Sequence, residues 1–493
     1  MPVGEGRTEF RVWAPNASSV AVRVHGVEHE LGEAGDGVHE GTVAASPGDD
    51  YLYVLDGERA LPDPYSRFQP DGVRGPSRVV DTSSFAIAAG PAPRLEELVL
   101  YELHVGTFSE EGTFAGVIPH LRGLRELGVT AIELMPVATF PGNRNWGYDG
   151  LYVYAPHPAY GGPDELARLV DAAHREGLAV FLDVVYNHIG PGSEAISAFG
   201  PWFTDRFDTF WGDAIDYARG PVREWAIQNA ELWVRDYKVD GLRLDAVHAV
   251  FDDSPTHVLA ELKQRVGSAL VVSEMQVDDW RPIEEWGHDA QWADASHHEL
   301  HVLLTGEREG YYARYGSLER LAERLRGDGR PPEKLVVCAQ NHDQVGNRAL
   351  GDRLPREALR VAAAVTLFSR CTPLLFMGEE YAEPQPFRFF TDHIDPFIAD
   401  ATREGRKKEF ERFSAFSKHE VPDPQDEQTF KRSKLSRRKD ERQLELYRTL
   451  LRLRRELPRD LETRVEGKIL HLRRGRVELV ADFDRKEVEL RGA

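Results

Sequence analysis

The sequence predicts an α/β protein with a (β/α)8 barrel, preceded by a β-sandwich and followed by a short β domain. Three observations support this fold class. The chain has 493 residues, enough for a barrel of about 250 residues or more with further parts attached. Its middle alternates short apolar runs with amphipathic helical segments, which is typical of βα units. Both ends instead show short strand-like runs separated by turn residues.

The first 90 residues are expected to form a small immunoglobulin-like sandwich. Four strands are predicted at Thr8–Trp13, Val20–Val24, Val38–Val43 and Tyr51–Leu55. The dipeptides Asp36-Gly37, Pro47-Gly48 and Asp56-Gly57 are turn signals, and this spacing favours an antiparallel sandwich. Residues 90–93, Gly-Pro-Ala-Pro, have the composition of a linker to the next domain.

Residues 96–457 are expected to form the barrel. Its strands are predicted at Leu98–Leu103, Ala131–Leu134, Leu178–Val185, Gly241–Asp245, Leu270–Glu274, Ala290–Ala293, Leu335–Ala339 and Pro373–Met377. Helical spacing is found between several of them, at Phe114–Leu127, Pro163–Glu176 and Pro221–Tyr237. Repeated units of this length imply a parallel sheet, and about eight of them imply a closed barrel.

The charged stretch 402–456 is expected to present a solvated helix face, and it leads into a Leu-rich helix at Leu444–Leu457. Residues 458–493 are predicted to form the short C-terminal β domain, because apolar and polar residues partly alternate after Arg464. Only about 30 residues follow Arg464, so this domain is small.

Charge and cysteine content exclude several classes of partner. The formal net charge of −21 repels phosphate backbones and anionic lipid, whereas a neutral sugar is indifferent to it. The two cysteines, Cys338 and Cys371, are too few for a disulfide scaffold or a multi-thiolate metal site. The chain shows neither a signal peptide nor a run of about 18 apolar residues, so a cytoplasmic protein is expected.

Polar residues gather at the ends of four predicted strands, where such barrels carry their function. These places are Asp183–His188 after the third strand, Arg243–His248 in the fourth, Glu274 in the fifth, and Asn341–Asp343 after the seventh. Any one of these residues alone could be a helix cap, a turn former or an ordinary hydrogen-bonded histidine. Asp183 in particular could be a purely structural partner. The joint pattern is what indicates a site.

The spacing suggests a chemistry for this site. Arg243 and Asp245 are two residues apart on a strand, so their side chains point to the same side and the guanidinium would hold the carboxylate ionised. An ionised carboxylate suits a glycosidic nucleophile. Glu274 is then the natural general acid, because crowding by Asp245 and partial burial favour its protonated form. Asp343 would be a third acid, able to bind sugar hydroxyls.

These four segments, in this order, resemble the four short regions of the α-amylase family, and the resemblance covers residues 98–456. It implies Asp245 as nucleophile, Glu274 as acid/base and Asp343 as transition-state stabiliser. It also implies that Tyr148 stacks on the sugar. The further substrate contacts that it implies are His188, Arg243, His248, Asp294, His297, His298, Asn341, His342, Gln344 and Asn347.

Further segments resemble one group within that family. Phe10–Pro15 is similar to the start of the sandwich that precedes the barrel in branching enzymes, debranching enzymes and maltooligosyltrehalose trehalohydrolases. The last group is favoured by Asp294–His298, by Phe376–Tyr381 with Thr391-Asp392-His393 downstream, and by Pro422–Asp426. Without this resemblance, His297-His298 would be interpreted as a structural pair. The short C-terminal domain departs from the fuller sandwich of relatives.

The resemblance implies a retaining hydrolase that releases trehalose from maltooligosyltrehalose, with a maltooligosyltrehalose-forming synthase as functional partner. A glycogen branching enzyme would use the same acids and remains an alternative, as does a non-catalytic glucan-binding protein. No metal-ligand spacing is visible and carboxylate catalysis needs no metal, so neither a cofactor nor a metal is predicted.

Overall fold

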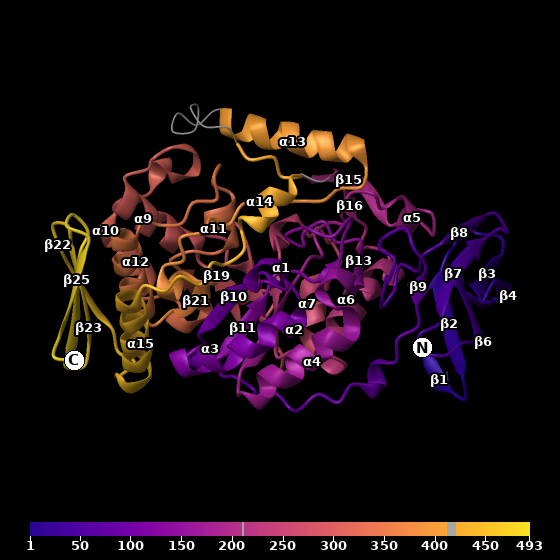
Figure 1. The fold of residues 1–493 in the computed structure, drawn as a ribbon, viewed down its shortest axis with the longest axis horizontal. Helices are drawn as coiled ribbons and strands as arrows, with labels where there is room; N and C mark the ends of the chain where they lie inside the picture. The colour runs from indigo at the N-terminus through magenta and orange to yellow at the C-terminus, as the bar shows by residue number, and fades with distance from the viewer. Residues whose placement is uncertain (210–211, 412–420) are drawn as a thin grey trace.

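A closed barrel of eight parallel strands forms the centre of the protein, in a computed structural model that describes residues 1–209, 212–411 and 421–493 (Figure 1). The strand order around the barrel follows the chain order. The strands are β10 (Leu100–Leu103), β11 (Ala131–Leu134), β14 (Ala179–Val184), β17 (Gly241–Leu244), β18 (Leu270–Ser273), β19 (Ala290–Trp292), β20 (Leu335–Cys338) and β21 (Thr372–Phe376). The predicted fold class is therefore confirmed, and six of the eight predicted strands end one residue earlier than expected, among them the two that stop just before Asp245 and Glu274.

The barrel strands are buried on both faces, even in β10, β11 and β14, where a mainly apolar strand contains one acid. Inside the barrel, Leu100, Phe181, Val272 and Trp292 belong to one buried apolar cluster. A side chain at position 241 would collide with the ring of Phe181, so only glycine fits where β17 passes that ring.

Helices surround the barrel between successive strands. The principal ones are α3 (Leu121–Leu127), α4 (Gly162–Arg175), α6 (Gly220–Arg235), α7 (Val258–Val266), α9 (Asp294–Thr305), α10 (Leu318–Leu325) and α12 (Arg356–Phe368). The single helix predicted over Phe114–Leu127 is wrong in one respect. Pro119 lies in a 3-10 turn, Ile118–His120, that separates α2 (Phe114–Val117) from α3. Proline has no N–H to continue a helical ladder and is tolerated only in a first turn, so a new turn begins there.

Two antiparallel sheets precede the barrel and contain the four predicted strands. One sheet has the order β1-β2-β6-β5 and the other β4-β3-β7-β8, with β9 also on β7. Their bounds are β1 Pro2–Gly4, β2 Arg7–Trp13, β3 Val20–Val24, β4 Val27–Glu30, β5 Gly32–Gly35, β6 Val38–Ala44, β7 Asp50–Leu55, β8 Arg59–Leu61 and β9 Ser77–Arg78. Phe10, Val22 and Tyr53 lie in the buried cluster that the two sheets share.

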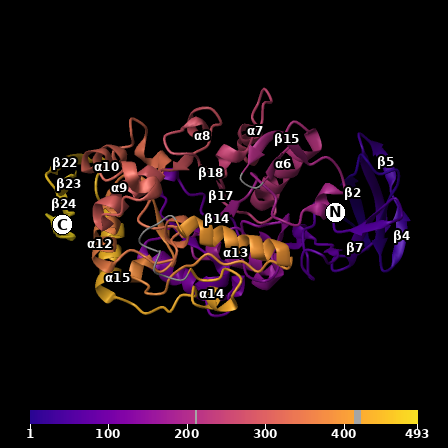
Figure 2. The same ribbon diagram turned by 90° about the horizontal axis from the view of Figure 1, so that it is seen from above.

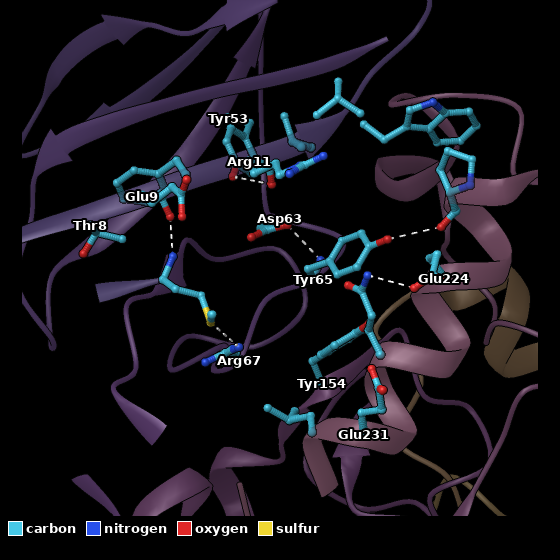
Figure 3. Close-up of a pocket in the computed structure, with 18 of the residues that line it drawn as sticks. Thr8, Glu9, Arg11, Tyr53, Asp63, Tyr65, Arg67, Tyr154, Glu224 and Glu231 are labelled. Atoms are coloured by element: carbon cyan, nitrogen blue, oxygen red, sulfur yellow. Dashed lines mark hydrogen bonds between the residues drawn. The ribbon is translucent and has the colours of Figure 1, made fainter. Parts of the chain in front are cut away.

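A cavity of about 1330 Å³ lies between these sheets and α6 (Figure 3). Tyr65 reaches across it, and its hydroxyl donates to the main-chain oxygen of Pro221 at 3.2 Å. Its ring is 5.1 Å from that of Tyr154, whose hydroxyl donates to Trp225 O. None of the described residues that line this cavity is a predicted site residue.

The C-terminal region packs on the other side of the barrel (Figure 1). A four-stranded antiparallel sheet, β22 (Glu462–Glu466), β23 (Ile469–Arg474), β24 (Val477–Asp482) and β25 (Glu487–Arg491), contacts α12. The Leu-rich helix α15 (Glu441–Glu456) buries Leu444, Tyr447 and Leu450 and leaves Arg448 and Arg452 exposed, so it has the predicted solvated face. Residues 412–420 of the charged stretch lie outside the described residues.

One long helix lies across an end of the barrel. This helix, α13 (Pro396–Glu411), lies above the strands in Figure 1 and in the foreground of Figure 2, which is seen from above. Arg406 on α13 donates to the main-chain oxygen of Gly346 at 2.7 Å, at the end of α11 (His342–Gly346). Because α11 follows β20, this is the end where the strands terminate. None of the described helices is long and apolar enough to cross a membrane.

Candidate active site

Arg243 is the centre of the site. It lies on β17 with its side chain fully buried, and its Nη1 donates to Asp245 Oδ1 and to Asp183 Oδ2, each at 2.8 Å. Its Nη2 donates to Glu274 Oε2. The guanidinium also stacks over the ring of Trp292 at 4.2 Å. Burial opposes its charge, but Asp183 and Glu274 outweigh burial and raise the pKa of Arg243 above its usual value. One cation therefore holds three carboxylates together.

Main-chain hydrogen bonds between neighbouring strands place the two central acids. The N–H of Asp245 donates to Val184 O at 3.0 Å, and the N–H of Glu274 donates to Leu244 O at 2.9 Å. Ala246 then adopts a left-handed conformation with φ +40°, unusual for a residue with a side chain. Its N–H donates to Glu274 Oε2 at 3.1 Å. This backbone outlier lies beside the acids, where strain of this kind is often kept for function.

The three acids named by the sequence all reach solvent. Their side chains are 11 % exposed for Asp245, 20 % for Glu274 and 30 % for Asp343. Asn187 donates from Nδ2 to Asp245 Oδ2 at 2.7 Å, so hydrogen bonds reach both oxygens of this carboxylate. The adjacent guanidinium and the Asn187 amide therefore hold this carboxylate in one orientation, as a positioned nucleophile requires.

The third acid is placed by α11. Asn341 caps this helix by accepting from the N–H of Gln344 at 2.8 Å, and Asp343 lies in its first turn. His342 Nε2 lies 3.4 Å from Asp343 Oδ2, and Asn347 donates to Asp343 Oδ1 at 2.9 Å. Five of the predicted residues therefore lie together on this short helix and its two caps.

Tyr148 connects this helix to the centre of the site. Its hydroxyl donates to Asp183 Oδ2 at 2.6 Å and lies 2.8 Å from His342 Nε2. The two rings stack at 5.1 Å, and the Arg243 guanidinium lies 5.9 Å from the Tyr148 ring. Its main-chain oxygen lies 2.9 Å from Nε2 of the predicted contact His188. The structure therefore brings Tyr148, His188, Arg243 and His342 together.

Two carboxyl groups, one buried and one partly buried, have pKa values raised toward neutrality. Burial raises the pKa of Asp183 to about 7, with Asp245 adding to it and Arg243 opposing it. Burial also raises the pKa of Asp294 to about 7, and the negative charges of Glu274 and Asp343 contribute. Asp294 therefore lies close enough to both acids to sense their charge.

The other predicted contacts lie around this centre in different environments. His248 is exposed in the 3-10 turn Val247–Ala249 that follows Asp245. Gln344 accepts from the Tyr312 hydroxyl at 3.3 Å. His297 and His298 are buried on α9, and the ring of His298 stacks on Tyr315 at 4.9 Å. This packing fits a structural histidine pair as well as a sugar contact, so their role as contacts stays a prediction.

Residues that the sequence did not single out complete the site. Glu102 on β10 accepts from both the main chain and the ring of His342, and Trp292 on β19 supports Arg243. Asn187 lies in the segment Asp183–His188, which the sequence analysis had singled out. Its polar amide side chain at a strand end was the signal that could have identified it. Glu102 also had a signal, because it is an acid inside an otherwise apolar strand. Among the residues that the structure describes, no three His, Cys, Asp or Glu side chains form a group that could hold a metal ion.

Comparison with known proteins agrees with this geometry. Residues 61–200 match the family model described as alpha amylase, catalytic domain. A malto-oligosyltrehalose trehalohydrolase from Deinococcus radiodurans is 46 % identical, and the alignment covers 96 % of this chain and 86 % of the relative. The enzyme of that name from Saccharolobus solfataricus is 40 % identical, over 92 % of this chain and 86 % of the relative.

A solved structure from Salmonella typhimurium, provisionally assigned as an alpha amylase, superposes with a TM-score of 0.89 at 36 % identity, over 97 % of this chain and 92 % of that one. A closed barrel with carboxylates beyond its strand ends is the architecture of an α-amylase-type glycosidase. Within that class, the chain belongs to the malto-oligosyltrehalose trehalohydrolase family.

Proposed function

We propose that this chain hydrolyses the α-1,4 bond between a terminal trehalose unit and a malto-oligosaccharide, releasing trehalose with retention of configuration. The supporting observation is that one guanidinium, that of Arg243, bonds both Asp245 and Glu274. Retaining glycosidases keep their two carboxyl groups about 5–5.5 Å apart, against about 6.5–9.5 Å in inverting ones. Two acids bonded to one guanidinium favour the shorter distance between carboxyl groups, that of a retaining enzyme. The names of the relatives support maltooligosyltrehalose as the substrate.

In the first step Asp245 is the nucleophile. Its carboxylate, held by hydrogen bonds from Arg243 and Asn187, forms a bond to the anomeric carbon of the glucose next to trehalose. The glycosidic bond breaks, and Glu274 gives its proton to the leaving oxygen, which belongs to trehalose. The ring carbon passes through an oxocarbenium-like state, and the negative charge of Asp343 lies near enough to stabilise it.

In the second step water resolves the covalent intermediate. Glu274, now ionised, takes a proton from water while the water oxygen bonds to the anomeric carbon. The bond to Asp245 breaks and the malto-oligosaccharide leaves. Two displacements at one carbon give net retention. We assign the sugar contacts to the residues that surround these acids, namely Tyr148, His188, Arg243, His248, Asp294, His297, His298, Asn341, His342, Gln344 and Asn347.

Product analysis tests this function directly. Incubation with maltooligosyltrehalose is expected to release free trehalose, and the new reducing end should appear first as the α-anomer by proton NMR. In parallel, incubation with amylose is expected to give no α-1,6 branches. Branches without trehalose would favour a branching enzyme, because a glucan hydroxyl would then replace water. Binding without trehalose or new reducing ends would favour a non-catalytic protein.

Three further points belong to the same proposal. The substrate is supplied by a maltooligosyltrehalose-forming synthase, since this substrate already carries its trehalose unit. The chain works in the cytoplasm, which its two free, buried cysteines, Cys338 and Cys371, support. Residues 1–90, 96–457 and 458–493 are its three domains, in line with the separate sheets at either end of the barrel.

A further inference from the structure

A buried carboxylate in the first barrel strand forms two hydrogen bonds with His342. Glu102, on β10, is 1 % exposed. Its Oε2 accepts from the main-chain N–H of His342 at 2.8 Å, and its Oε1 lies 2.6 Å from Nδ1 of the same residue. We infer that Glu102 is a positioning residue that holds His342 as a doubly protonated imidazolium, and that it acts through this cation on Asp343 and Tyr148. The inference rests on the proposed function for its catalytic consequence.

With Glu102 and Asp183 both ionised, the hydrogen bonds around His342 require a proton on each of its ring nitrogens. A carboxylate only accepts, so Nδ1 donates to Glu102. The Tyr148 hydroxyl has one proton and gives it to Asp183, which already accepts from Arg243 on both oxygens at 2.8–2.9 Å. Tyr148 therefore accepts from His342 Nε2, which must also carry a proton. A ring protonated at both positions is cationic.

The charges that face His342 support this state. Burial opposes the positive charge, but Asp343 and Glu102 outweigh it and raise the pKa of His342 to about 10. Arg243 opposes the charge from β17. The other titratable groups whose charges interact with His342 are His104, Glu133, Asp183 and Asp294. The rings of Tyr148, Trp146 and Trp292 pack around the imidazole.

A fixed cation at this position has a consequence for the reaction. His342 Nε2 lies 3.4 Å from Asp343 Oδ2, so the imidazolium places a positive charge beside this carboxylate. An ionised Asp343 is what the oxocarbenium-like transition state requires. Glu102 is buried behind His342 and contacts neither the substrate nor the reacting atoms in the proposed mechanism. Its effect should therefore fall on kcat more than on KM.

The variant Glu102→Gln tests the inference, because it keeps the size of the side chain and removes its charge. In the folded protein labelled with ¹⁵N-histidine, the His342 signal, assigned by its loss in His342→Gln, is expected to titrate about 1–3 pH units lower than in the wild type. The kcat for trehalose release should fall about 10- to 100-fold at pH 7, with KM changed less than about threefold. Glu102→Asp retains the charge and should keep most of the wild-type titration.

Glu133→Gln is the matched control. Glu133 is paired with Glu102 in register on the adjacent strand, is equally buried, and its carboxyl oxygens bond no described residue. Because burial raises the pKa of Glu133 well above its usual value and keeps it uncharged, its variant should leave the His342 titration unchanged. An unchanged titration in Glu102→Gln would overturn the inference, and so would a neutral His342 in the wild type at pH 8, even if the variant failed to fold. A wild type that releases no trehalose would refute the proposed function alone, because the spectra do not depend on turnover.

Discussion

Replacing Asp245 by Asn is expected to lower the rate of trehalose release by about 10⁴-fold or more, because the covalent intermediate can no longer form. The amide fills nearly the same volume, and its oxygen can still accept from Arg243 Nη1, which lies 2.8 Å from Asp245 Oδ1 in the wild type. The loss should therefore appear in kcat and not in the fold. Chromatography of trehalose released from maltooligosyltrehalose measures it.

The control for this variant is its thermal unfolding midpoint, which should fall only modestly, because the amide keeps the hydrogen bond from Arg243 and loses that from Asn187. Weak substrate binding should also survive, since sugar contacts remain. A folded Asn variant that keeps a tenth of the wild-type rate would contradict the assignment of Asp245 as nucleophile. The same outcome would remove the basis for a retaining mechanism.

Arg243→Met is expected to destabilise the protein by about 3–5 kcal/mol and to abolish measurable turnover. Removing one member of a buried ionic group leaves its partners uncompensated, which costs far more than the group contributes net. Here the partners are Asp183, Asp245 and Glu274, and the methionine can provide none of their hydrogen bonds. Urea unfolding followed by circular dichroism gives the change in free energy.

Arg265→Met provides the comparison for the stability effect. Arg265 also bonds two acids, Glu231 at 2.8 Å and Glu224 at 3.2 Å, but its side chain is 37 % exposed. Exposed ion pairs contribute about 0–1 kcal/mol, so this variant should unfold nearly as the wild type does. Equal losses of stability in the two methionine variants would contradict the expectation that unpaired buried carboxylates cause the destabilisation.

The barrel could be predicted from sequence because its strands are buried on both faces. Short, mainly apolar runs such as Leu335–Cys338 are local signals, and they predicted all eight strands. Strands of the sandwich with few apolar residues were missed, including Val27–Glu30 and Gly32–Gly35. These strands lie at sheet edges, where one side faces water and the alternation that marks a strand disappears.

Only those site residues that give a local sequence signal could be predicted. Asp245 and Glu274 stand out as acids at the ends of apolar strands, which packing does not require. Glu102 has a similar setting, but its meaning depends on His342, which is 240 positions away in the chain. This contact forms only when the barrel closes and brings the first strand and the end of the seventh strand to the same interior space. Tertiary partners of this kind are absent from any local pattern.

Glu133 makes folding of the barrel a proton-uptake event. Its carboxyl is 1 % exposed and its oxygens bond no described residue, and burial first, then Glu102, raise its pKa well above the usual value. The unfolded chain releases this proton above about pH 4.3, whereas the folded chain keeps it. The free energy of unfolding therefore falls with rising pH by about 1.4 kcal/mol per unit from this group alone, until Glu133 ionises in place. The barrel is therefore expected to lose stability toward unfolding as the pH rises into the alkaline range.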